Sequence, residues 1–233
     1  ALDQPVPRLK MAKSHFPEYV EEVLALKEKY ANQIEVLLGV ESDYIPGKTD
    51  LYAAEYAKYP MDYVIGSVHG IGEVSIFAQG EWEQLDQQGR ERVKRTYYEL
   101  IQGAVKCGEY QIIGHLDALK TRFPQYSETA PEIVDETLRI IGEHDGVIEV
   151  NTSGDRKGLT EWFPSPEVLE RAHYYNVQVT FGSDAHRPEH VGAHWDEVCR
   201  SLREIGYRHW IIFRNKKPYP IEIDITVSDI GDD

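Results

Sequence analysis

Short apolar runs alternate with amphipathic segments along most of the chain. Residues 16–31 carry apolar side chains at helical spacing, and the apolar run at residues 34–39 is typical of a buried strand. The same alternation follows five more times. The further predicted helices cover residues 49–58, 90–106, 131–144, 165–174 and 195–205, and the further predicted strands cover residues 62–66, 111–113, 147–150, 177–181 and 209–213. Helices of this length between strands predict parallel strands joined by helical crossovers.

The six predicted strands fit either an open, doubly wound sheet or a barrel. No glycine-rich phosphate loop follows an early strand, which disfavours the dinucleotide-binding form of the open sheet. A length of 233 residues suits one large domain. We therefore predict a single α/β barrel domain over residues 1–233, in which residues 218–233 form a C-terminal extension that is either an extra strand with a frayed end or disordered.

Composition and charge narrow the classes of partner. The chain has 40 Asp and Glu residues against 25 Lys and Arg residues, a formal net charge of -15. This balance argues against nucleic acid as a partner, because nucleic-acid affinity rests largely on Lys and Arg. No apolar run approaches the roughly 18 residues of a membrane span, so no membrane partner is expected. The two cysteines, Cys107 and Cys199, lie far apart, which favours a reducing cytoplasm. A small-molecule partner is expected, and the oligomeric state stays open.

Polar side chains follow five successive predicted strands. The carboxyl ends of parallel strands meet at one rim, where functional side chains gather. The segments that follow the strands are Glu41-Ser42-Asp43, Ser67-Val68-His69, Gly114-His115-Leu116-Asp117, Asn151-Thr152-Ser153-Gly154 and Gly182-Ser183-Asp184-Ala185-His186. Three histidines and several carboxylates at one rim predict a divalent metal site, because imidazole and carboxylate suit Zn²⁺, Mn²⁺ and Fe²⁺.

Each of these motifs also has a structural interpretation when it is taken alone. A single His after a strand is more often a hydrogen-bonded structural residue than a metal ligand. Asp117 could cap the following helix, and Asp184 could cap a turn. Their occurrence together at successive strand ends is what favours a metal site. Arg156 and Arg187 lie close to this rim in the sequence, and a guanidinium suits a phosphate monoester.

Five segments that occur in order resemble the polymerase-and-histidinol-phosphatase (PHP) superfamily, specifically its histidinol-phosphatase branch. They are Gly-Val-Glu-Ser-Asp-Tyr (39–44), Asp-Tyr-Val-Ile-Gly-Ser-Val-His (62–69), Ile-Gly-His-Leu-Asp (113–117), Val-Asn-Thr-Ser-Gly (150–154) and Gly-Ser-Asp-Ala-His-Arg-Pro-Glu-His-Val-Gly (182–192). The resemblance implies a distorted (βα)₇ TIM-like barrel with a cluster of up to three divalent metal ions, usually Zn, Mn or Fe. It also implies hydrolysis of L-histidinol phosphate to L-histidinol and phosphate in histidine biosynthesis.

The resemblance further implies roles for individual residues. Glu41 resembles a carboxylate that bridges two metals, with His69 and His115 completing one site. Asp184 resembles a ligand of the second metal and His186 a ligand of the third, and both are candidates for protonating the leaving group. The expected substrate contacts are Arg156, Arg187, Asn151 and Ser67.

One part of the family pattern is missing from this sequence. The family begins with a strand that carries His-x-His and a second strand that ends in Asp-His, and neither is present here. We expect that the first β-α-β unit of the barrel is absent because this chain is a truncated form; a genuine variant with a depleted cluster is the alternative. Two other functions stay open, a PHP-type phosphoesterase that acts on nucleotides and a non-catalytic metal-binding relic.

Overall fold

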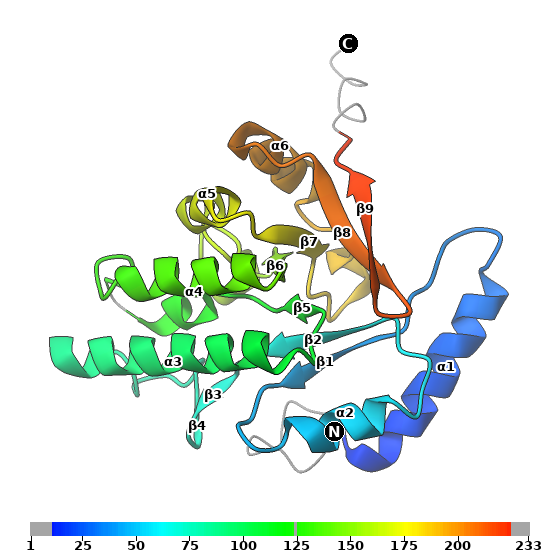
Figure 1. Cartoon of the computed structure of the whole chain (residues 1–233), viewed down its shortest axis with the longest axis horizontal. Coiled ribbons are helices and arrows are strands. Elements are labelled where there is room, and N and C mark those ends of the chain that lie inside the picture. Colours follow the sequence, from blue (N-terminus) through cyan, green and yellow to red (C-terminus); the bar gives the residue numbers. More distant parts are fainter. Residues whose placement is uncertain (1–10, 124, 225–233) are drawn as a thin grey trace.

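Five parallel strands form the central sheet of the computed structural model, which describes residues 11–123 and 125–224. Their order in the sheet is β1-β2-β5-β6-β7, the same as their order in the chain (Figure 1). The strands are β1 (Gly39–Asp43), β2 (Tyr63–Ser67), β5 (Ile112–Ile113), β6 (Val147–Asn151) and β7 (Gln178–Gly182). All four pairings are parallel. An order that never reverses is that of a barrel wall rather than of a doubly wound sheet, so the predicted α/β class with parallel strands is confirmed.

Within residues 11–123 and 125–224, six α-helices accompany the strands. They are α1 (Phe16–Lys29), α2 (Thr49–Tyr56), α3 (Gln87–Cys107), α4 (Glu132–Glu143), α5 (Pro166–Tyr174) and α6 (Trp195–Ile205). Short 3₁₀ helices lie at Lys13–His15 (η1), Ala118–Arg122 (η2), Asp155–Lys157 (η3) and Pro188–His190 (η4), and a small hairpin is formed by β3 (Gly70–Ile71) and β4 (Val74–Ser75). α3 begins where the Asp86 side chain accepts a hydrogen bond from the Gly89 N–H, and it ends at Gly108, whose positive φ suits glycine.

The apolar core lies between the sheet and α3–α6. Ile148 and Val150 of β6 pack there with Leu138 of α4 and Leu169 of α5, and all four are fully buried. α1 and α2 form a smaller cluster against the start of the sheet. Among the helices of the described residues, none is long and apolar enough to cross a membrane.

The first strand begins five residues later than predicted. β1 pairs with β2 from Gly39↔Tyr63 to Asp43↔Ser67, so residues 34–38 precede the strand instead of forming it. The Leu38 N–H donates to the Asp62 side chain rather than to a neighbouring strand, and Ile34 is exposed. The apolar run therefore marks the approach to the strand, and Glu41 lies inside the strand rather than after it.

The last predicted strand does not join the parallel sheet. β8 (His209–Arg214) packs against β7 but pairs antiparallel with β9 (Lys217–Glu222). Asn215 and Lys216, both with positive φ, form the two-residue turn that reverses the chain. β9, which contains Pro218 and Pro220, covers the first residues of the predicted C-terminal extension. Residues 225–233 lie outside the described residues.

The turn of this hairpin is tied to the amino ends of β1 and β2. The Asp62 carboxylate, which is almost fully buried, accepts hydrogen bonds from the Asn215 N–H (3.0 Å), the Leu38 N–H (2.8 Å) and the Lys27 ammonium (2.9 Å). The Arg214 guanidinium binds both oxygens of Glu35 at 2.5 and 2.6 Å. The hairpin thereby spans from β7 to the opposite edge of the sheet (Figure 1). Within the described residues β1 pairs with β2 alone, and the missing first unit stays a prediction.

We expect Asp62→Ala to lower the free energy of unfolding by about 2–4 kcal/mol, because it leaves two backbone N–H groups and Lys27 without this acceptor. Burial opposes ionisation of Asp62, but the three hydrogen bonds outweigh it and lower the pKa of the carboxyl group. The stabilisation is therefore complete above the unfolded-state pKa of about 3.9 and is lost as the pH falls through the lower folded-state pKa.

Urea unfolding of the wild type and of Asp62→Ala at several pH values measures the difference in their free energies of unfolding. The control is Glu143→Ala, which removes the exposed ion pair with Arg139 and should change stability by less than about 1 kcal/mol. Equal stability of wild type and Asp62→Ala at neutral pH would contradict the assigned role.

Candidate metal centre

Three ligand atoms from neighbouring strands converge at the carboxyl end of the sheet. Glu41 lies on β1, His69 follows β2 and His115 follows β5. The His115 Nε2 lies 3.0 Å from the His69 Nε2, and the Glu41 Oε1 lies 3.2 Å from the former and 3.4 Å from the latter. The three residues were predicted together, and the structure brings them together as a group that could hold a metal ion.

The spacing of these three atoms fits a divalent metal ion. Ligands at about 2.0–2.1 Å from a tetrahedral zinc lie about 3.3 Å from one another, which matches the separations of 3.0–3.4 Å. Enclosure by the protein works against ionisation of Glu41, but His115, His69 and Ser67 outweigh it and lower the pKa of the carboxyl group. Burial opposes protonation of His115, yet Glu41 outweighs it and raises the pKa of the imidazole. The arrangement therefore favours positive charge between the three side chains.

Further side chains hold the three ligands in place. The Asp43 Oδ1 lies 2.5 Å from the His69 Nδ1, so the Nδ1–H donates to Asp43 and the Nε2 lone pair faces the other two ligands. The Ser67 hydroxyl donates to the Glu41 Oε1 at 2.6 Å. The buried Glu149 carboxylate accepts from the His115 backbone N–H at 3.0 Å. Burial raises the pKa of Glu149.

Sequence reasoning did not single out Asp43 or Glu149. Their signal is the alternation of side chains along a strand, because residues two apart share one face. Glu41 and Asp43 are two apart on β1, as are Glu149 and Asn151 on β6. When the first strand is predicted at residues 34–39, Glu41 and Asp43 fall outside it, and their position on one face of a strand cannot be recognised.

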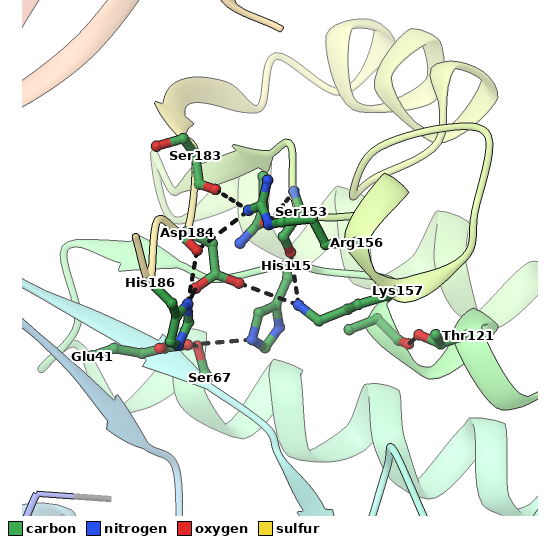
Figure 2. Close-up of polar contacts among 12 residues, drawn as sticks. Glu41, Ser67, His115, Thr121, Ser153, Arg156, Lys157, Ser183, Asp184 and His186 are labelled. Atoms are coloured by element: carbon green, nitrogen blue, oxygen red, sulfur yellow. Dashed lines mark hydrogen bonds and ion pairs between the residues drawn. The ribbon is translucent and has the colours of Figure 1, made fainter. Parts of the chain in front are cut away.

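Asp184 and His186 lie across the same cavity from the three ligands. Asp184 follows β7 with a φ of 48°, and its Oδ2 lies 3.2 Å from the Lys157 Nζ. The His186 imidazole is 83% exposed, and its Nδ1 lies 2.9 Å from the Asp184 backbone oxygen. Burial opposes ionisation of Asp184, but Lys157 outweighs it and lowers the pKa of the carboxyl group. Figure 2 shows Asp184 and His186 turned toward Glu41 and His115.

All five predicted metal ligands line one cavity of about 580 Å³. This volume is within the usual range for small-molecule sites. Tyr63 and Phe77 contribute aromatic walls, and Lys157 contributes a cation that sequence reasoning passed over in favour of the arginines.

The four predicted substrate contacts stay predictions, and the structure gives the partners or the exposure of each side chain. Ser67 binds Glu41, and the Asn151 side chain donates to Glu149 and accepts from the Ser153 N–H. The Arg156 guanidinium donates to the backbone oxygens of Ser183 and Asp184. The Arg187 side chain is 72% exposed. Neither arginine lines the cavity.

Known proteins resemble this chain over most of its length. Residues 8–153 match the PHP domain, and residues 167–205 match the PHP-associated family. The chain is 31% identical over 224 residues to a probable histidinol-phosphatase of Deinococcus radiodurans, which covers 93% of this chain and 84% of the relative. It is 28% identical to the histidinol-phosphatase of Bacillus subtilis, over 78% of this chain and 75% of the relative.

A solved structure has a similar fold. It is the histidinol phosphate phosphatase of Lactococcus lactis, complexed with zinc, L-histidinol and phosphate. The TM-score is 0.72 at 22% identity, over 87% of this chain and 79% of that chain. The likeness supports the TIM-like arrangement of the strands.

We expect His115→Ala to abolish retention of a divalent metal at this centre, because it removes one of three converging ligand atoms and leaves the other two. Elemental analysis after dialysis measures the metal content. The matched control is His209→Ala, which removes an exposed histidine of β8. Unchanged metal content in His115→Ala would show that His115 is a structural residue.

We expect Asp43→Ala to weaken zinc affinity by about 10–100-fold, because the His69 imidazole loses the acceptor that fixes its tautomer and orientation. Competition with a chromophoric chelator measures the affinity. Asp50→Ala, which changes an exposed carboxylate of α2, is the control. An affinity equal to that of the wild type would mean that Asp43 does not orient His69.

Proposed function

Because the chain belongs to the PHP domain family, in its histidinol-phosphatase branch, we propose that it is a metal-dependent phosphatase that hydrolyses L-histidinol phosphate to L-histidinol and phosphate. The observation that carries the proposal is the convergence of Glu41, His69 and His115 in a cavity that suits a small molecule. Curated relatives with the same activity in their names, and the zinc, L-histidinol and phosphate in the Lactococcus lactis structure, support it.

Glu41, His69 and His115 would hold one divalent cation, and Asp184 would supply a ligand for a further cation. The two predicted roles of His186, metal ligand and proton donor, exclude each other, and we propose the second. When bound, such a cation acts as a Lewis acid that lowers the pKa of water and offsets the charge of a phosphate. The preference among Zn²⁺, Mn²⁺ and Fe²⁺ follows metal availability as well as ligand type.

The chain's own residues orient the reacting groups and handle the proton. Water adds its oxygen to phosphorus and gives up a proton, the phosphorus–oxygen bond to the alcohol breaks, and the departing alkoxide takes up a proton, so that alcohol and phosphate form with no net release of protons. His186 is placed to deliver that proton, because its Nδ1–H donates to the Asp184 backbone oxygen and leaves Nε2 for the substrate. The Asp184 Oδ1 lies 3.6 Å from the His186 Nδ1, so the Asp184 carboxylate helps to orient the His186 ring.

Three of the predicted substrate contacts act indirectly in this proposal. Ser67 orients Glu41, Asn151 orients Glu149, and Arg156 fixes the backbone that carries Asp184. Direct contact between Arg187 and the substrate stays a prediction.

We place the protein in the cytoplasm and expect no nucleic-acid partner. The free cysteines Cys107 and Cys199 and the net charge of -15 support this.

Phosphate release from a substrate panel tests the function. We expect the natural full-length protein, stripped with a chelator and reloaded with Zn²⁺ or Mn²⁺, to hydrolyse L-histidinol phosphate in preference to nucleoside monophosphates. The stripped protein should be inactive, because the ligands alone do not offset the phosphate charge. Preference for a nucleotide would replace the proposed substrate, and metal retention without turnover of any ester would identify a metal-binding relic.

A further inference from the structure

We propose that Lys157 binds the phosphate group of the substrate, an assignment that rests on the proposed function and deepens it. Among the described residues that line the 580 Å³ cavity, Lys157 is the only Lys or Arg. Its ammonium group points toward the Asp184 carboxylate (Figure 2).

The surrounding residues hold the Lys157 ammonium in one position. The Nζ donates to the Ser153 Oγ at 2.7 Å and to the Asp184 Oδ2 at 3.2 Å. It also lies 5.2 Å from the ring centre of Phe77 and 5.4 Å from that of Phe163. An ammonium group has three donors, so these two hydrogen bonds leave one N–H for a ligand.

The charge of the cavity favours a further cation such as Lys157. Glu41, Asp43 and Asp184 are three carboxylates that line it, and a phosphate monoester brings further negative charge. An ammonium with a side chain only 25% exposed is weakly screened, so its attraction for an oxyanion is stronger than at the surface.

The two arginines are less suited to this contact, because neither lines the cavity. The Arg156 Nη2 donates to the Ser183 and Asp184 backbone oxygens, and the Arg187 side chain is exposed to solvent. Lys157 is the next residue after Arg156 on η3, and the turn of this short helix directs the two side chains differently. Lys157 therefore takes the role that the sequence suggested for its neighbour.

Lys157→Met tests the assignment, because methionine keeps an unbranched apolar stem between Phe77 and Phe163 but has no donor. Binding of inorganic phosphate to the metal-loaded protein is measured by calorimetry, and KM and kcat are measured with L-histidinol phosphate. We expect phosphate affinity to fall about 10–100-fold and KM to rise by a similar factor, with unchanged zinc content. Lys157→Arg should restore part of the phosphate affinity, because it returns the charge with a different geometry.

The control is Lys106→Met, which removes an exposed lysine of α3 and should leave phosphate binding unchanged. Phosphate affinity in Lys157→Met equal to that of the wild type would overturn the proposal, as would a loss confined to Arg156→Met. If Lys157→Met does not fold, Lys157→Gln gives the same readout. Phosphate binding is measured without turnover, so a wild type that binds phosphate but leaves histidinol phosphate intact would refute the proposed function and not the phosphate contact.

Discussion

The parallel register of three neighbouring strands is the constraint on which the candidate site depends. Glu41 pairs with Ile65 across β1 and β2, and Gly66 pairs with Ile113 across β2 and β5. A slip of one residue in β1 would turn Glu41 to the other face of the sheet, away from the two histidines. The ladder bonds and the buried core behind the sheet therefore supply the free energy that holds a carboxylate and two imidazoles within contact of one another.

The rim of the sheet could be predicted from the sequence, but the direction of individual side chains could not. Apolar runs mark buried strands, and the polar residues after them identified Glu41, His69 and His115. An apolar run does not determine which backbone N–H groups pair with a neighbouring strand. The first strand was therefore predicted too early in the chain, and β8 was predicted to join the parallel sheet, whereas it pairs with β9. Arg156 and Lys157 are adjacent in sequence, and only the fold decides that the lysine faces the cavity.

The contacts that join distant segments lie at the amino ends of the strands, and the candidate functional residues lie at their carboxyl ends. At the amino end, Asp62 and the Glu35–Arg214 pair join segments that are far apart in the chain. At the carboxyl end, Glu41, Asp43 and Asp184 bring like charges together, which destabilises the fold unless a cation offsets them. Changes at the carboxyl end can therefore alter ligand binding while the bonds at the other end keep the strands in place.

The prolines of β9 determine which backbone hydrogen-bonding groups the outer edge of the hairpin offers to another strand. The Ile223 N–H donates to the Arg208 oxygen, so by alternation the backbone groups of residues 218, 220 and 222 point away from β8. Pro218 and Pro220 have no N–H, and the outer border of β9 thus presents almost solely acceptors. A foreign strand would find no complementary ladder there. Pro218 and Pro220 consequently protect this edge of the hairpin against edge-to-edge polymerisation.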